Sequence, residues 1–278
     1  MDMTLDAPTF EIQIQDVEYQ RGLMATIYRP IGTGPFAALV EVHGGAWTSK
    51  DRTNNADTAK VLAEHGLVVM CIEFRMPPQA AYPGSLQDIN LAIRWLKAHA
   101  RDYASAPERV GLYGTSSGGH QVLLAAMRPD DARYAALPGP ARVDATVAFT
   151  ISGWGVLAPL DRYRLAKKLG KAELVKNHDA FWGSEAAMGE GSPPLMLARG
   201  EKVALPPALV FQGTADEWVT VAQAEAFAAA WRKAGGVMEL GLYEGEKHTF
   251  VNENPGSPNA KKAVESIIAF ARKYGGGT

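Results

Sequence analysis

Apolar runs recur along the chain, and the first two differ in character from those that follow. Residues 10–19 and 23–29 are extended segments separated by the turn-prone Gln20-Arg21-Gly22. This spacing predicts an antiparallel strand pair at the edge of a sheet. The later runs are almost continuously apolar, as in parallel strands covered on both faces. They are residues 37–42, 67–74, 109–113, 145–151, 208–211 and 238–243.

Stretches with helical periodicity alternate with these later strands. In one of them, Leu86, Ile89, Ile93 and Leu96 fall on one helix face, which predicts an apolar stripe directed toward the sheet. The predicted helices are residues 54–65, 86–99, 118–126, 220–234 and 259–273. This alternation indicates an α/β fold with a mostly parallel, doubly wound sheet and right-handed crossovers.

One segment interrupts the alternation. Residues 157–205 combine a basic helical piece, 162–176, with Phe181-Trp182-Gly183 and the Pro193-Pro194 region. We expect a short, cap-like insertion after the sixth strand and not a second domain. Since the chain has 278 residues and no low-complexity linker, residues 1–278 are expected to form one domain.

Composition and charge exclude several classes of protein. The 30 acidic and 28 basic side chains leave a net charge of −2, which indicates neither a nucleic-acid binder nor an acidic tail. The 47% of apolar residues suffice for a sizeable core. The single cysteine, Cys71, lies in an apolar run and is interpreted as a core residue.

The start of the chain carries no targeting signal that we recognise. Residues 1–6 are acidic and lack the basic and apolar regions of a signal peptide. No stretch approaches the roughly 18 apolar residues of a membrane span. A cytoplasmic protein that contacts neither nucleic acid nor a membrane is therefore expected.

A glycine- and serine-rich turn follows the strand predicted to end at Tyr113. Residues 114–118, Gly-Thr-Ser-Ser-Gly, match G-x-S-x-G between a strand and a helix, which is the context of a nucleophile elbow. The glycines allow neighbouring backbone to pass close to a serine lifted out of its strand. Ser116 is therefore the candidate nucleophile, with a plain glycine-serine turn as the alternative.

A second turn of small residues, His43-Gly44-Gly45-Ala46-Trp47, follows the strand over residues 37–42. Exposed backbone N–H groups in such a loop can stabilise the negative charge that develops on a carbonyl oxygen during acyl transfer. We assign the amides of Gly45, Ala46 and Ser117 to this oxyanion hole. Taken alone, the loop would be an ordinary glycine turn, and only its pairing with a serine elbow favours the functional interpretation.

Two further candidates follow the last two predicted strands. Asp216 comes after residues 208–211 and His248 after residues 238–243. Catalytic groups gather at this edge of open α/β sheets. We expect His248 to accept the proton of Ser116 and Asp216 to orient His248, with the adjacent Glu217 as a possible substitute. The chain order serine, aspartate, histidine is typical of α/β-hydrolases.

The other five histidines have structural interpretations. His43 is expected to brace the amide loop and His120 to pack behind the elbow, while His65 and His99 lie near helix ends and His178 on the surface. Neither H-E-x-x-H nor C-x-x-C occurs. No metal is therefore predicted.

Tryptophans are candidates for the walls of a substrate pocket. Trp47 and Trp154 follow strands and are expected to line the pocket, with core packing as the alternative for each. The same interpretation is weaker for Trp182 and Trp218.

Nearly the whole chain resembles the α/β-hydrolase superfamily, in particular the esterase branch related to hormone-sensitive lipase and to bacterial feruloyl/acetylxylan esterases. Tyr28-Arg29-Pro30 is similar to the Y-R-P entry of that branch, and the stretch from Glu73 to Asp88 to its D-Y-R-L-x-P…F-P…D segment. The chain departs from the common H-G-G-G and G-D-S-A-G-G motifs by carrying Ala46 and the sequence Gly114 to Gly119. The resemblance implies the α/β-hydrolase fold and serine hydrolase chemistry.

These features predict a serine carboxylesterase that hydrolyses small to medium esters through an acyl-enzyme intermediate and needs no cofactor. The His43 to Trp47 loop is also similar to the H-G-G-x-W of arylformamidases, so an amidase of that type remains open. A non-catalytic binding protein of the same fold is the alternative of another class. A small-molecule ester is the expected partner, and residues 238–243 and 263–270 are compatible with a homodimer contact or with ordinary core.

Overall fold

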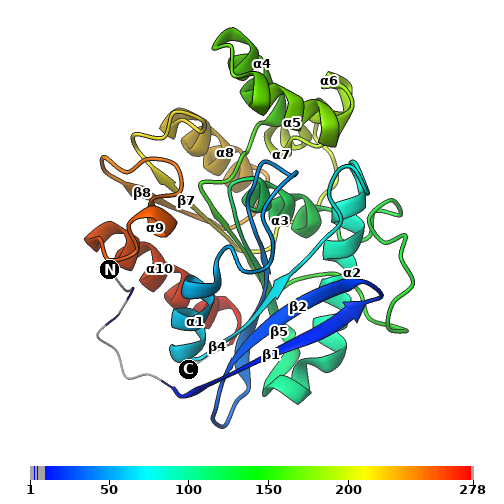
Figure 1. The fold of residues 1–278 in the computed structure, drawn as a ribbon, viewed down its shortest axis with the longest axis vertical. Helices are drawn as coiled ribbons and strands as arrows, with labels where there is room; N and C mark the ends of the chain where they lie inside the picture. The colour runs from blue at the N-terminus through cyan, green and yellow to red at the C-terminus, as the bar shows by residue number, and fades with distance from the viewer. Residues whose placement is uncertain (1–2, 4, 6–9, 277–278) are drawn as a thin grey trace.

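The computed structural model describes residues 3, 5 and 10–276, and its strands form an eight-stranded sheet in the order β1-β2-β4-β3-β5-β6-β7-β8 (Figure 1). The N-terminal pair β1 and β2 is antiparallel and lies at one edge, and from β4 onward the paired strands are parallel. The predicted edge pair and mostly parallel sheet are confirmed. The strands are β1 (Ile12–Gln20), β2 (Leu23–Pro30), β3 (Phe36–Val42), β4 (Leu67–Ile72), β5 (Ser105–Thr115), β6 (Thr150–Gly153), β7 (Ala208–Gly213) and β8 (Met238–Tyr243).

Helices cover both faces of the sheet. On one face, α1 (Ala56–Glu64) and α10 (Pro258–Tyr274) share a core with Ala37 and Leu39 of β3. On the other face, α2 (Gly84–His99), α3 (Ser117–Met127) and α8 (Val221–Lys233) pack with Ala38 and Val40 of the same strand. Because successive strand residues point to opposite faces, the continuous apolar pattern fills two cores at once. A 3₁₀ turn, η1 (Ala100–Tyr103), follows α2, and α9 (Phe250–Glu253) precedes α10.

Strand β6 is shorter and later than the pattern predicts. It spans Thr150–Gly153, whereas residues 145–149 of the predicted strand carry no regular structure. Its neighbour β7 begins at Ala208, which pairs with Thr150. Residues before Thr150 therefore have no pairing partner in β7. Apolar content alone does not reveal where β6 begins.

The insertion between β6 and β7 is entirely helical in its regular parts. The predicted basic helix over residues 162–176 is in fact two helices, because Gly170 between them adopts a left-handed backbone with φ of +63°. Figure 1 shows α4, α5 and α6 projecting beyond the sheet on the side where α3 begins. The insertion comprises α4 (Pro159–Lys168), α5 (Ala172–Trp182), α6 (Glu185–Glu190) and α7 (Pro193–Ala198).

The late apolar elements have different surroundings. Ala263, Val264 and Ile267 of α10 are fully buried in the core, whereas β8 is the edge strand and exposes Leu242. A homodimer contact remains a prediction from the sequence, as does a cytoplasmic location. No helix among residues 10–276 is both long enough and apolar enough to cross a bilayer. Most of the acidic opening segment, residues 1–6, lies outside the described residues.

Candidate active site

Ser116 stands on a sharp turn between β5 and α3. Its backbone adopts φ of 53° and ψ of −118°, an unusual conformation for a residue with a side chain. A Cβ on Gly118 would lie 2.0 Å from the carbonyl oxygen of Val42, and one on Gly114 would lie 2.6 Å from the backbone of Gly118. The two glycines are therefore required where the turn passes against neighbouring backbone. This is the geometry that G-x-S-x-G predicts.

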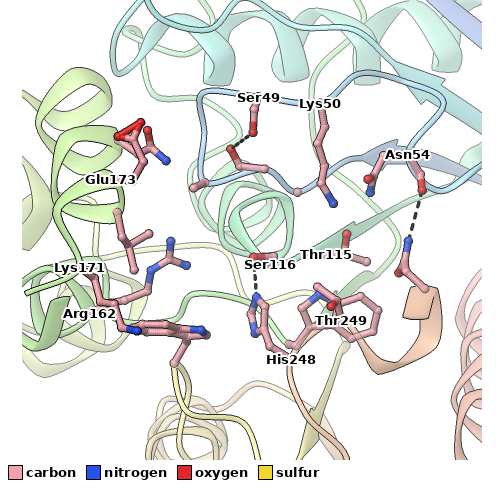
Figure 2. Close-up of a pocket in the computed structure, with 18 of the residues that line it drawn as sticks. Ser49, Lys50, Asn54, Thr115, Ser116, Arg162, Lys171, Glu173, His248 and Thr249 are labelled. Carbon is pink, nitrogen blue, oxygen red and sulfur yellow. Dashed lines mark hydrogen bonds between the residues drawn. The ribbon is translucent and has the colours of Figure 1, made fainter. Parts of the chain in front are cut away.

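Three side chains from separate loops form a hydrogen-bonded series at this turn. The Oγ of Ser116 lies 2.9 Å from Nε2 of His248, and Nδ1 of His248 lies 2.7 Å from Oδ2 of Asp216 (Figure 2 shows the first bond). A carboxylate can only accept, so Nδ1 carries the proton and Nε2 is free to accept from the serine hydroxyl. The structure thus brings together the three residues that the sequence singled out.

Asp216 is held by several donors besides the histidine. Its Oδ1 accepts from the backbone N–H groups of Trp218 at 2.7 Å and Val219 at 3.1 Å, and its Oδ2 also accepts from Nε2 of Gln212 at 2.6 Å. Burial opposes ionisation, but the hydrogen bond and charge of His248 together with these donors keep the pKa of Asp216 below its usual value. The neighbouring Glu217 is exposed, and no hydrogen bond or ion pair joins it to His248. The histidine is therefore oriented by Asp216.

The amide loop lies beside the serine. Gly45 has φ of +109°, and a Cβ there would lie 2.1 Å from the carbonyl oxygen of Ser49. Within residues 10–276, no acceptor is found for the N–H groups of Gly45, Ala46 and Ser117. Ser117 is the first residue of α3, where backbone donors have no partner inside the helix. Its Oγ accepts from the N–H of Trp47 at 3.1 Å, which joins the loop to the elbow.

His43 supports this loop from beneath. Its Nδ1 donates to the carbonyl oxygen of Gly44 at 2.7 Å, and its ring stacks on Phe74 with centroids 4.4 Å apart. Burial lowers the pKa of His43 to about 4, so the ring is neutral at physiological pH. These contacts are those of a bracing residue.

A cavity of about 560 Å³ opens above the series. Ser116, His248, Gly45 and Ala46 line it from the sheet side. Trp154 also belongs to the lining, but it is 1% exposed and its ring packs edge-on against Phe211 and Phe250. Helices α4 and α5 supply the opposite side. A site of this size accommodates a small organic molecule.

Trp47 does not line this cavity, contrary to the expectation from the sequence. The side chain is 1% exposed and stacks on Phe181 of α5 with centroids 5.4 Å apart. Trp182, for which the pocket interpretation was weaker, packs edge-on against Trp47. Trp218, the other weak candidate, does line the cavity. Trp47 therefore belongs to an aromatic core that it forms with residues of the insertion. This contact joins segments that are far apart in the sequence.

His178 also differs from its prediction, because it is fully buried and not on the surface. Its Nδ1 donates to the carbonyl oxygen of Leu174 at 2.7 Å, and its ring packs against Trp47. Burial lowers the pKa of His178 to about 4. The spacing of Leu174, His178 and Phe181, which places them on one helix face, was the sequence signal for this burial. His120 packs in the same aromatic group, behind the elbow as predicted.

The sequence interpretation missed a buried polar network under the cavity. Asn55 donates from Nδ2 to Oε1 of Glu41 at 2.5 Å and to Oγ1 of Thr115 at 3.2 Å, and Oδ1 of Asn55 accepts from Asn252 at 2.7 Å. Burial raises the pKa of Glu41 to about 7. The network connects β3, the end of β5, and α9 just beyond His248. A charged residue inside an otherwise apolar strand was the one available signal.

Arg162, Lys50 and Lys171 line the cavity and were also missed. Nothing in the sequence marks Arg162 among the basic residues of its segment. For metals, the side chains within residues 10–276 include no group of three or more histidine, cysteine, aspartate or glutamate residues placed to share an ion.

Comparisons with known proteins agree on a family and a fold. The BD-FAE family model matches residues 26–231. The chain is 27% identical over 66% of its length to the probable carboxylic ester hydrolase LipM of Mycobacterium tuberculosis, and 27% identical over 85% of its length to the probable isoprenylcysteine alpha-carbonyl methylesterase ICMEL1 of Oryza sativa. It covers 45% and 56% of these two proteins, so it spans about half the length of the curated relatives it matches.

Solved structures resemble the chain over nearly its whole length. Esterase Est2 of Thermogutta terrifontis with bound propionate is 26% identical, with a TM-score of 0.72 and coverage of 96% of this chain and 94% of that one. Esterase B of Lactobacillus rhamnosis, at 21% identity and a TM-score of 0.78, supports the fold alone. The expected α/β-hydrolase architecture is therefore confirmed.

Proposed function

The chain belongs to the BD-FAE family, and from that premise we propose that it is a serine carboxylesterase that hydrolyses small to medium esters. The proposal is carried by one observation, the hydrogen-bonded series Asp216, His248 and Ser116 that opens into a cavity beside three amides with no acceptor among the described residues. Relatives named as ester hydrolases support it.

In the proposed reaction, the Oγ of Ser116 attacks the ester carbonyl carbon while Nε2 of His248 takes the hydroxyl proton. A C–O bond to Ser116 forms and the carbonyl oxygen becomes an oxyanion. The ester C–O bond then breaks, and His248 returns the proton to the departing alcohol. Water, deprotonated by the same nitrogen, releases the acyl group. Asp216 holds the tautomer and stabilises the imidazolium.

The amides of Gly45, Ala46 and Ser117 would hold the oxyanion. Preorganised N–H donors cost no reorganisation at the moment of reaction, and removing one such donor typically costs about 10² to 10³ in kcat. The left-handed backbone at Gly45 and Ala46 turns this loop beside the serine. Alanine offers its N–H as glycine does, so the departure from H-G-G-G leaves the chemistry unchanged.

The insertion over residues 157–205 would act as a cap on one domain formed by the whole chain. Helix α4 supplies Arg162 to the cavity, and residues 171–174 come from α5 and the residue that precedes it. A cavity of about 560 Å³ suits a small or medium ester. Trp154 and Trp218 would contact its apolar part.

The test replaces Ser116 by alanine and measures hydrolysis of 4-nitrophenyl butyrate. We expect turnover to fall by about 10⁴-fold or more with an unchanged circular dichroism spectrum. Ser266→Ala, on α10 and outside the cavity lining, is the matched control and should keep wild-type activity. Near-normal turnover by Ser116→Ala would reject the assignment.

Covalent labelling and an amide panel separate the remaining alternatives. A fluorophosphonate should label the wild type and not Ser116→Ala. An esterase of Thermogutta terrifontis, 25% identical, is known in a form phosphonylated by sarin. A folded protein that neither labels nor hydrolyses esters would be a binding module. Faster turnover of N-formyl anilides than of matched esters would instead indicate an amidase.

A further inference from the structure

The guanidinium group of Arg162 is a buried cation at the wall of the cavity. Arg162 belongs to α4 of the insertion and is 5% exposed as a residue. It lines the same cavity as Ser116 and His248, and Figure 2 shows its side chain extending from the insertion toward them. Burial lowers the pKa of Arg162 to about 10, so it remains positively charged at neutral pH.

No polar side chain or carbonyl group within residues 10–276 pairs with this cation. Its Nε is buried without a hydrogen-bond partner, and no ion pair to its terminal nitrogens is found. The ring of Trp47 lies 5.2 Å from its central carbon. A cation–π contact with one ring does not satisfy the five N–H donors of a guanidinium group. The N–H groups of Arg162 therefore still need hydrogen-bond acceptors.

The nearest functional carboxylate does not fill this role. Both oxygens of Asp216 are already occupied, Oδ2 by His248 and Gln212 and Oδ1 by two backbone N–H groups. It makes no hydrogen bond to Arg162, and its negative charge only partly offsets the effect of burial on the pKa of Arg162. A buried charge without a partner is costly and is seldom kept unless a ligand supplies the counter-charge.

The rest of the cavity lining adds positive charge. Lys50 and Lys171 are exposed at its rim, and the lining includes one acidic residue, Glu173. Glu173 is itself exposed and lies 3.6 Å from Lys176. The cavity is thus cationic in a chain whose net charge is −2. Clefts lined by one sign of charge concentrate ligands of the opposite sign.

We propose that Arg162 is a specificity-determining residue that binds a carboxylate carried by the substrate, so that the preferred substrates are esters with a free carboxylate group. This inference rests on the proposed esterase function and names its substrate class. The planar fork of N–H donors matches a carboxylate in a bidentate arrangement, which a lysine at the same place would not reproduce.

Matched pairs of esters test the preference. One pair carries the charge on the acyl side, mono-4-nitrophenyl glutarate against 4-nitrophenyl valerate. The other carries it on the alcohol side, 3-butyryloxybenzoate against phenyl butyrate. We expect the wild type to favour the anionic member of at least one pair by about tenfold or more in kcat/KM. Arg162→Met should remove that preference, and Arg162→Lys should restore only part of it.

Lys168→Met is the matched control, because it removes an exposed positive charge from the same helix as Arg162 and lies outside the cavity lining. It should leave the ratio of the two kcat/KM values unchanged. If Arg162→Met lowers both members of each pair equally, the residue is structural and the inference is overturned. If the wild type hydrolyses neutral esters and shows no anionic preference, the inference fails while the esterase function stands.

Binding measured without turnover keeps the inference testable if no ester is hydrolysed. Calorimetry of monomethyl glutarate with Ser116→Ala should show binding that weakens by about tenfold or more in Ser116→Ala/Arg162→Met. Binding should persist in Ser116→Ala/Lys168→Met. Thermal unfolding checks that each variant is folded. Absence of binding to folded Ser116→Ala, or equal binding with and without Arg162, overturns the carboxylate site.

Discussion

The two sides of the cavity differ in whether their charged side chains are paired. On the sheet side, Ser116, His248 and Asp216 are hydrogen-bonded to one another, and Asp216 has further donors. On the insertion side, the guanidinium group of Arg162 has no hydrogen-bond partner within residues 10–276. The charged side chains of the sheet side are thus paired with one another, whereas the cation of the insertion side has no charged partner among the described residues. The difference suggests that the sheet edge supplies reactivity and that the insertion selects what reacts.

Asp216→Asn is expected to have the largest effect on the sheet side. An amide at this position favours the wrong imidazole tautomer, and the comparable change in other serine hydrolases lowers kcat by about 10⁴-fold. Steady-state kinetics with 4-nitrophenyl butyrate measures it. Glu217→Gln is the control and should stay within about twofold of the wild type, since Glu217 is exposed. Equal losses in the two variants would contradict the assignment of Asp216.

Trp47→Ala tests the packing that joins the two sides. Its ring is buried between the amide loop and α5, and truncating a buried tryptophan typically costs about 3 to 5 kcal/mol of unfolding free energy. Urea unfolding measures the loss. Trp218→Ala, at the half-buried cavity edge, should cost less than about 1 kcal/mol. A small loss at Trp47 would mean that the insertion packs independently of the loop.

Gly45→Ala tests whether the amide loop belongs to the reactive side. The added Cβ would lie 2.1 Å from the carbonyl oxygen of Ser49 at a φ of +109°, so the loop must shift and its amides with it. We expect kcat to fall by about 10² to 10³. Gly22→Ala, at φ of +80° but in open space, is the control for backbone strain. It should cost about 1 kcal/mol in stability and no activity.

Glu41→Gln has the smallest expected effect, and that effect depends on pH. The pKa of Glu41 is raised from 4.5 to about 7 by burial, so its protonated form is favoured in the folded state. Its contribution to stability is full below the unfolded pKa and is lost as pH rises through the folded pKa. The unfolding free energy of the variant relative to that of the wild type should therefore rise by about 2 kcal/mol as the pH is raised from about 5.5 to about 8.5. Urea unfolding at the two pH values measures it, and a difference independent of pH would contradict the raised pKa.

Local features of the sequence predicted much of the fold and of the reactive residues. The edge strand pair, the parallel strands and the long helices follow from periodicity over short windows. Ser116 was predicted from the G-x-S-x-G motif. Its two glycines are four residues apart, and the steric contacts that require them arise at the turn itself. Asp216 and His248 follow from strands whose ends meet at one sheet edge.

The amino-acid sequence by itself determined which residues supply a hydroxyl, an imidazole, a carboxylate and a tight amide loop. Only the tertiary structure decided that the first two meet across 132 positions, that Trp47 belongs to the core, and that His178 is buried. It also decided that Arg162 alone among the basic residues of α4 faces the cavity without a polar partner. The physical reason is that burial and charge pairing depend on which distant segments pack together, and short-range patterns do not encode those contacts.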